Sequence, residues 1–217
     1  PAKATIDLSA LCHNYQLAKK LHGGHALAVI KADAYGHGAL SCAKALSPIA
    51  DGFAVAFIQE ALALREAGLK NKILALEGAF DSTDLLLASQ HQLDLVFHHP
   101  AQLAMLESAH LATGLTAWLK LNTGMNRVGF EPEELKYVWE RLRAHPGIKQ
   151  IIFITHLAQA DEPQALDAQG NSPTDMQIAR FNAAISTLPG QADAPRSLAN
   201  SAGILAWPNS HQDWARP

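Results

Sequence analysis

The 217-residue sequence predicts an α/β fold, a (β/α)8 barrel of the TIM type that stops before its eighth strand. Apolar runs rich in β-branched residues alternate with segments of helical spacing, which indicates parallel strands joined by crossover helices. Seven such runs follow a first helix, and the chain ends without an eighth. An open, doubly wound sheet is the rival fold, but the Gly-x-Gly-x-x-Gly turn that it carries after its first strand is missing.

The elements follow in order along the chain. Ser9 is expected to cap a first helix whose apolar face holds Leu11, Tyr15, Ala18 and Leu21. A helix over residues 58–68 is rich in good helix formers and ends on a glycine. Two further helices are expected to begin at residues 131–134 and 172–175, where proline and acids suit a first turn. The predicted strands cover residues 27–32, 52–57, 73–77, 93–97, 117–122, 151–155 and 197–200.

Composition excludes several classes of protein. The net charge of −3 offers no basic field for nucleic acid or an anionic membrane. The apolar stretches are short and broken by charges, and the start does not resemble a signal peptide, so we expect a cytoplasmic protein that neither spans nor binds a membrane. Cys12 and Cys42 form no disulfide framework, and the 11 histidines show no metal-ligand spacing, so no metal site is expected.

Reacting groups of a parallel barrel lie where its strands end, and the first such position is Lys31. A lysine that ends a buried strand ordinarily extends to solvent. Here Tyr35, Gly36 and Gly38 follow closely, which places a hydroxyl and exposed backbone N–H groups at the same rim. Partial desolvation at the end of a barrel lowers the pKa of a lysine amine and makes it a usable nucleophile. Such amines form Schiff bases with aldehyde cofactors.

Three later segments add polar groups to the same end of the predicted barrel. Lys120 lies within a strand, and Arg127 follows a glycine-containing turn, where it is either a surface residue or a fork of donors for a phenolate or carboxylate. By itself His156 is more often structural than catalytic. Asn200 and Ser201 follow a late strand, where barrels of this class commonly bind phosphate.

Together these segments resemble the alanine racemase family across essentially the whole chain. The most specific run is Val-Ile-Lys-Ala-Asp-Ala-Tyr-Gly-His-Gly at residues 29–38, and residues 5–8, 123–130, 155–158 and 200–202 follow in the family's order. Residues 213–217 resemble the family's last barrel strand, which normally continues through a glycine. The resemblance implies that residues 1–217 form the pyridoxal-phosphate-binding barrel domain, here incomplete, and that the family's C-terminal β-domain is absent.

The resemblance also implies how the cofactor is held. Lys31 would carry pyridoxal 5′-phosphate as an aldimine and, once the substrate displaces it, would act as the base for the D-enantiomer. Tyr35 and Ser201 would contact the phosphate, and Asn200 would belong to the same cofactor-binding group.

Four more residues receive roles from the resemblance. Arg127 would face the phenolic oxygen of the cofactor and the carboxylate of the substrate. Lys120 is often a carbamate in such enzymes, where it orients the arginine. His156 would lie beside the pyridine ring and hold Arg216, which would face the pyridine nitrogen.

The implied activity is the interconversion of L-alanine and D-alanine, which supplies D-alanine for the bacterial cell wall. Racemisation needs bases on both faces of Cα, and in the family the second base is a tyrosine from the other subunit of a homodimer. None of Tyr15, Tyr35 and Tyr137 matches it. We therefore expect residues 1–217 alone to lack efficient turnover and, as an open barrel, to aggregate or to need a partner. The alternatives are another amino-acid racemase, or a non-catalytic cofactor-binding barrel or fragment.

Overall fold

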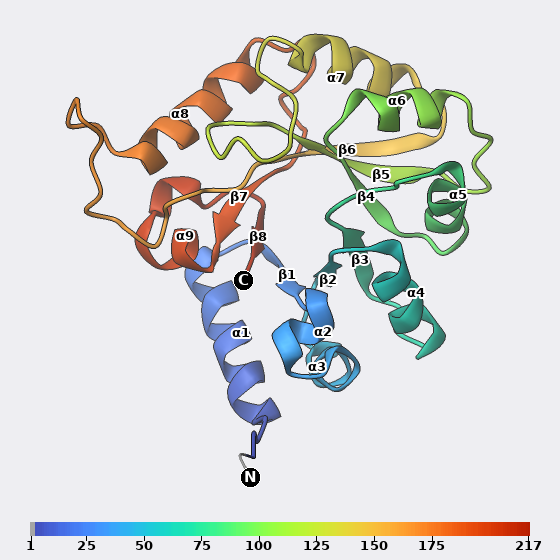
Figure 1. Cartoon of the computed structure of the whole chain (residues 1–217), viewed down its shortest axis with the longest axis vertical. Coiled ribbons are helices and arrows are strands. Elements are labelled where there is room, and N and C mark those ends of the chain that lie inside the picture. The colour runs from blue at the N-terminus through green and yellow to red at the C-terminus, as the bar shows by residue number, and fades with distance from the viewer. Residues whose placement is uncertain (1–2) are drawn as a thin grey trace.

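The computed structural model describes residues 3–217, and within that range eight parallel strands form one closed barrel. The strands neighbour one another in chain order, and the helices surround them (Figure 1). The seven predicted strands are confirmed, with ends shifted by a few residues. The strands are β1 (His25–Val29), β2 (Gly52–Val55), β3 (Lys72–Ala75), β4 (Asp94–Phe97), β5 (Leu115–Lys120), β6 (Ile148–Ile154), β7 (Arg196–Asn200) and β8 (Trp214–Arg216).

The prediction that the barrel stops before its eighth strand is wrong, because β8 closes it. Trp214 aligns with His25 of β1 on one side and with Ser197 of β7 on the other. Only three residues form β8, and Trp-Ala-Arg shows no apolar β-branched run, so the sequence pattern gives no signal for a strand. Closure leaves no strand edge free, which removes the basis for the expected aggregation through open edges.

Helices connect the strands and cover the outside of the barrel (Figure 1). The N-terminal helix α1 packs against α3, α9 and β1, so it lies on the outer side of β1. The helices are α1 (Leu8–His22), α2 (Lys31–Gly36), α3 (Ala39–Leu46), α4 (Ile58–Glu66), α5 (Ser82–Gln90), α6 (Pro100–Glu107), α7 (Leu135–Ala144), α8 (Pro173–Ser186), α9 (Ser201–Ala206) and the 3-10 turn η1 (Pro208–Ser210). No helix within residues 3–217 is both long and apolar enough to cross a membrane.

Two of the helix ends predicted from the sequence agree with the structure, and two differ from it. Gly68 follows α4 with φ +86°, as expected for a terminating glycine, and Ser172 caps α8 by accepting from Asp175 N at 3.1 Å. Asp7 rather than Ser9 caps α1, because its Oδ1 accepts from the backbone N–H of Ser9 at 2.9 Å. Residues 131–134 form a turn, and α7 begins after it at Leu135.

Two apolar layers stabilise the barrel. The larger layer lies between the strands and the helices, where most of the buried side chains pack. A smaller cluster fills the inside of the barrel. It consists of Leu27, Ala54, Leu74, Val96, Trp118, Ile152 and Ile154, with Val29, Leu76 and Trp214 packed against it. The interior is therefore a packed core, and a cavity can form only near an end of the barrel.

Polar contacts close the end of the barrel where the strands begin. Lys72 Nζ lies 2.7 Å from Asp94 Oδ2, and Trp118 Nε1 donates to the same oxygen at 2.9 Å. Burial raises the pKa of Asp94, and Lys72 counteracts that rise. Trp118 also packs edge-on against Trp214. Side chains of β3, β4, β5 and β8 therefore contact one another at this end of the barrel.

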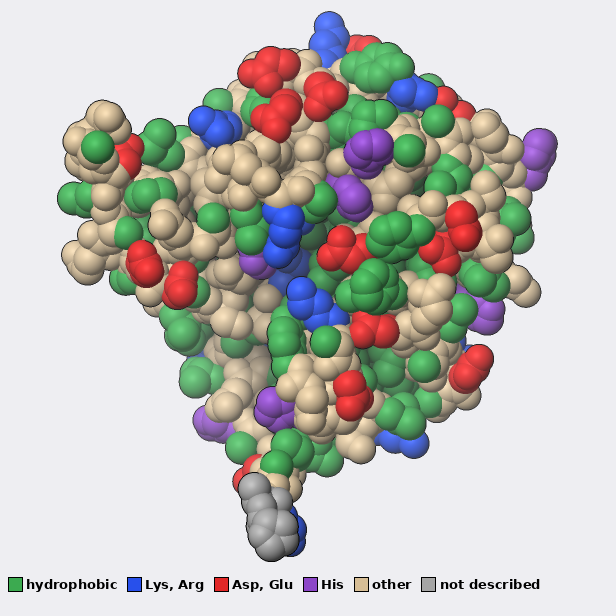
Figure 2. All heavy atoms as spheres, viewed as in Figure 1, with side chains coloured by type: hydrophobic (Ala, Val, Ile, Leu, Met, Phe, Trp, Pro, Cys, Tyr) green, Lys and Arg blue, Asp and Glu red, His purple; other side chains and the backbone are tan. Residues whose placement is uncertain are grey.

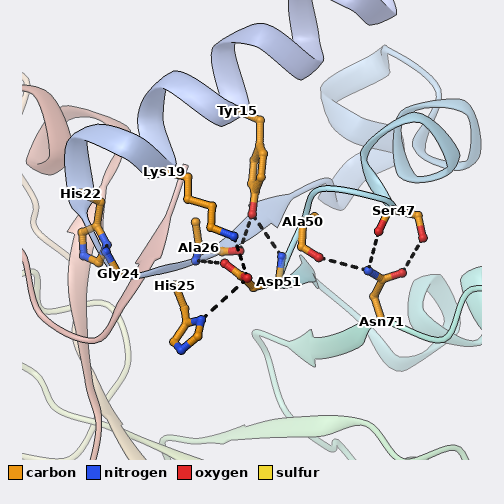
Figure 3. A network of polar contacts seen from close by, with 10 residues as sticks. All are labelled: Tyr15, Lys19, His22, Gly24, His25, Ala26, Ser47, Ala50, Asp51 and Asn71. Atoms are coloured by element: carbon orange, nitrogen blue, oxygen red, sulfur yellow. Dashed lines mark hydrogen bonds and ion pairs between the residues drawn. The ribbon is translucent and has the colours of Figure 1, made fainter.

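A second network joins α1 to the same end of the barrel (Figure 3). Tyr15 donates its hydroxyl to Ala26 O at 2.7 Å, and Lys19 Nζ lies 2.7 Å from Asp51 Oδ1. The other oxygen of Asp51 accepts from Ala26 N at 2.9 Å. These contacts fix α1 on β1 and the start of β2, which leaves the opposite end of the barrel for function.

Candidate active site

A cavity of about 520 Å³ opens where the strands end, and residues from six of the eight strand ends line it. Figure 2 shows lysine and arginine side chains gathered in a hollow near the middle of this face, with acidic side chains along part of its border. All eight site residues predicted from the sequence line this cavity: Lys31, Tyr35, Lys120, Arg127, His156, Asn200, Ser201 and Arg216. The structure therefore brings together residues that lie up to 185 positions apart in the chain.

Lys31 does not end a strand, as the sequence suggested, but begins a left-handed turn just after β1. Residues 32–35 have φ between 49° and 55° and ψ between 37° and 52°. Ala34 N donates to Ile30 O at 2.9 Å, which closes the turn. Left-handed helical backbone costs roughly 1–2 kcal/mol for each residue that is not glycine. Such cost is commonly found where a backbone presents functional groups, and this turn presents both Lys31 and Tyr35 to the cavity.

Arg127 is carried by a loop that folds back on the end of β5. Asn122 Oδ1 accepts from Asn126 N at 3.0 Å, and Phe130 N donates to Lys120 O at 2.9 Å. Gly129 has φ +132°, and a Cβ there would lie 2.7 Å from Asn122 N, so only glycine fits this close approach. The loop is thereby held against the end of β5, with Arg127 among the residues that line the cavity.

Positive charge dominates the electrostatics of the cavity. Burial, together with Arg216, Arg127 and Lys31, lowers the pKa of Lys120 to about 8. Burial and the same cationic surroundings lower the pKa of His156 to about 3, so its imidazole is neutral at pH 7. A cavity with this charge favours anionic ligands such as phosphate and carboxylate.

Arg216 is a buried cation, only 6% exposed. Its guanidinium donates to Thr155 O at 2.6 Å, to Leu198 O at 3.3 Å and to Ser197 Oγ. Burial lowers its pKa to about 10, so it remains protonated at neutral pH. Within residues 3–217 no carboxylate lies within ion-pair distance of it. Its orientation is thus set by β6 and β7, and the contact between His156 and Arg216 stays a prediction.

Hydroxyl and amide groups behind the cavity connect the loops after β5 and β6. Thr123 Oγ1 and Thr155 Oγ1 lie 2.7 Å apart, and Thr155 Oγ1 donates to Leu121 O at 3.1 Å. Gln177 Nε2 donates to Thr123 Oγ1 and to His156 O, both at 3.1 Å. The loop that carries Arg127 and the loop that carries His156 are therefore held together.

Sequence reasoning missed two acids in the cavity lining, Glu77 and Asp161. Glu77 follows β3, and its charge acts to raise the pKa of Lys120 against the surrounding cations. Its place at the end of an apolar run was the available signal, but a single acid in that position is common on surfaces. Asn200 was found, and its side chain also caps α9 by accepting from Gly203 N at 2.8 Å. Among residues 3–217 no group of three or more His, Cys, Asp or Glu is placed to hold a metal ion.

The chain is similar to known proteins over nearly its whole length. The family described as alanine racemase, N-terminal domain, matches residues 6–217. The alanine racemase of Azoarcus sp. (strain BH72) is 54% identical over all 217 residues, which span 59% of that relative. The crystal structure of the biosynthetic alanine racemase from Pseudomonas aeruginosa is 42% identical, with a TM-score of 0.87 over 98% of this chain and 57% of that one.

A histidine racemase from Leuconostoc mesenteroides shares the fold at 27% identity, with a TM-score of 0.79 over 96% of this chain and 56% of that one. The chain thus spans less than two thirds of the length of these relatives and corresponds to their barrel. The family match covers nearly the whole chain, and the resemblance inferred from the motifs is confirmed: the chain belongs to the alanine racemase N-terminal domain family.

Proposed function

We propose that this chain is the cofactor-binding barrel of a pyridoxal-phosphate-dependent enzyme that interconverts L-alanine and D-alanine. One observation carries the proposal: a single cavity holds the amine of Lys31, the guanidinium groups of Arg127 and Arg216, and the hydroxyls of Tyr35 and Ser201. The family relationship supports the same activity, because the relatives named above are alanine racemases.

The donor set fits pyridoxal phosphate. An amine suits its aldehyde, hydroxyl donors suit its phosphate, and a guanidinium suits its phenolate oxygen. Residues proposed to hold it are Lys31, Tyr35, His156, Asn200, Ser201 and Arg216, and all of them line the cavity. When bound, the cofactor supplies an aldehyde for amines and a conjugated ring that delocalises the electron pair left at Cα.

Arg216 would set the electronic character of the ring. Its pKa of about 10 keeps it a cation at pH 7, so it would donate a hydrogen bond to the pyridine nitrogen without giving up its proton. A pyridine ring whose nitrogen carries no proton withdraws electron density less strongly. Return of a proton to Cα would then be favoured over side reactions. His156, with its pKa near 3, would face the ring as a neutral group.

Lys120 is proposed to carry a carbamate. Because its pKa is about 8, part of the amine is neutral at pH 7. The neutral nitrogen can add to the carbon of CO₂, and loss of one proton then leaves a carbamate anion. That anion would balance the positive charge around it and orient Arg127, which would bind the substrate carboxylate.

Proton exchange at Cα needs a base on each face, and Lys31 is proposed as one of them. Tyr35 lines the cavity, Tyr15 donates to Ala26 O at the opposite end of the barrel, and Tyr137 lies exposed on α7. The second base is proposed to come from the partner subunit of a homodimer. Full racemase turnover by purified residues 1–217 would contradict this assignment.

A second candidate is racemisation of another amino acid. The similarity to a histidine racemase supports it, because the same fold serves a larger substrate there. Initial rates of the complete enzyme across alanine, serine, lysine and histidine distinguish the two candidates. A clear preference for alanine is expected.

The first experiment tests cofactor attachment. Residues 1–217 are mixed with pyridoxal phosphate, reduced with borohydride and digested, and the modified lysine is identified by mass spectrometry. Label is expected on Lys31 and is expected to disappear in Lys31→Ala, while Lys44, exposed on α3, serves as the control for unspecific labelling. Label spread evenly over surface lysines would refute the proposed function.

A further inference from the structure

Side chains near the start of alternate helices each bridge two neighbouring loops at the cavity end of the barrel. Gln102 of α6 accepts from His98 N at 2.8 Å, after β4, and donates to Glu77 O at 3.2 Å, after β3. Gln177 of α8 accepts from Ala158 N at 2.8 Å, after β6, and donates to Thr123 Oγ1, after β5. The third bridge is made by Glu60 of α4, and it involves the loop of Lys31.

Glu60 joins the loops after β1 and β2. Its Oε2 accepts from Ala56 N at 2.6 Å and from Phe57 N at 3.1 Å, both directly before α4. Its Oε1 accepts from Ala32 N at 2.7 Å, and Ala32 is the first residue of the turn with left-handed backbone angles. One carboxylate therefore connects the start of α4 with the residue that follows Lys31.

Capping of α4 explains only half of these contacts. An acid at the third position of a helix commonly accepts from the N–H of its own cap residue, and Oε2 does so. The contact of Oε1 with Ala32 spans 28 residues of sequence and contributes nothing to α4. A left-handed turn leaves its first N–H groups without partners in the turn itself, so this N–H needs an acceptor from elsewhere.

We propose that Glu60 is a positioning residue, which holds the left-handed turn in place and thereby directs the amine of Lys31 into the cavity. The inference rests on the proposed function of Lys31. Because Ala32 is exposed, water can replace the lost acceptor, so removal of the carboxylate changes the position of the turn more than the stability of the fold. The unfavourable backbone of residues 32–35 makes that change easy once the acceptor is lost.

The test compares Glu60→Met with Gln102→Met in residues 1–217. Both substitutions keep side-chain length and remove a bridge, but the loops that Gln102 joins carry none of the eight predicted site residues. Attachment of pyridoxal phosphate to Lys31 is titrated by borohydride reduction. Glu60→Met is expected to weaken the attachment of the cofactor about tenfold, because it removes a hydrogen bond to a charged acceptor beside Lys31. Gln102→Met is expected to weaken the attachment less than about twofold, because its bridge lies elsewhere.

Two further measurements keep the outcome clear. Competitive acetylation of Lys31 against Lys44 reports the reactivity of the amine without any cofactor, and it is expected to change in Glu60→Met and not in Gln102→Met. Glu60→Gln, which keeps one acceptor oxygen, is expected to lie between wild type and Glu60→Met, and it carries the test if Glu60→Met does not fold. Equal effects of the Glu60 and Gln102 substitutions on both readouts would overturn the inference. Failure of wild type to label Lys31 with the cofactor refutes the proposed function instead, and acetylation still tests Glu60.

Discussion

Lys120 is expected to destabilise the folded chain at neutral pH, so replacing it with methionine should stabilise the protein. The amine lies at the end of β5 in a cavity that also holds Lys31, Arg127 and Arg216. Methionine keeps the length of the side chain and removes the charge. The gain comes from ending the burial of a cation among other cations.

The magnitude follows from the pKa. Burial and neighbouring cations lower it from 10.5 to about 8, and each pKa unit corresponds to about 1.4 kcal/mol, so the penalty is at most about 3.5 kcal/mol. Contact with water in the cavity reduces the expected gain to about 2 kcal/mol. Below pH 8 the amine is charged in both states and the whole penalty applies. Between pH 8 and 10.5 only the unfolded chain keeps the proton, so wild-type stability rises with pH and the advantage of Lys120→Met disappears.

The assay is urea unfolding followed by tryptophan fluorescence, in buffer free of CO₂, at pH 7 and at pH 10.5. Lys120→Met is expected to be more stable than wild type at the lower pH and equal to it at the higher. Adding bicarbonate at pH 7 should stabilise wild type only, because carbamate formation replaces the cation with an anion. A variant that is less stable than wild type at pH 7, or a difference that does not depend on pH, would refute the reasoning.

Two other predictions test the site and its backbone. His156, with a pKa of about 3, should show no titration of its imidazole resonances by NMR between pH 5 and 9. Its contribution to stability should be lost as pH falls from 6.5 toward 3, because only the unfolded chain takes up the proton in that range. A titration midpoint of the imidazole near pH 6.5 in the folded protein would contradict the burial argument. Ala32→Gly should stabilise the chain by roughly 1 kcal/mol in the same urea assay, because glycine adopts left-handed backbone angles without the cost that alanine has. Ala63→Gly, in the right-handed helix α4, should destabilise the chain by a similar amount. Destabilisation by both substitutions would contradict the left-handed turn.

Much of the site was predictable because of where chemistry occurs in a parallel barrel. Lys31, Arg127 and His156 each follow an apolar run, and the ends of parallel strands meet at one rim. Residues distant in sequence could therefore be assigned to one cavity from the sequence alone. Glu60 and Gln177 could not, because a polar residue near the start of a helix has the same pattern whether it faces solvent or bridges two loops.

The left-handed turn was not predictable either. Ala-Asp-Ala-Tyr contains no glycine, and local preference favours a right-handed conformation for these residues. The turn exists because surrounding contacts, among them the bridge from Glu60, hold a backbone that is unfavourable by itself. Its consequence is that Lys31 opens a turn rather than ending a strand.

The sequence by itself determined the barrel class, seven of its strands, the family and eight of the residues that line the cavity, since all of these depend on periodic patterns and specific local motifs. The tertiary structure decided whether the barrel closes, how the backbone after Lys31 turns, and how far the ionisable groups of the cavity depart from their ordinary pKa values. The physical reason is the same in each case. A three-residue strand exists only through hydrogen bonds to its two neighbours, and a strained turn and a depressed pKa exist only through the groups packed around them.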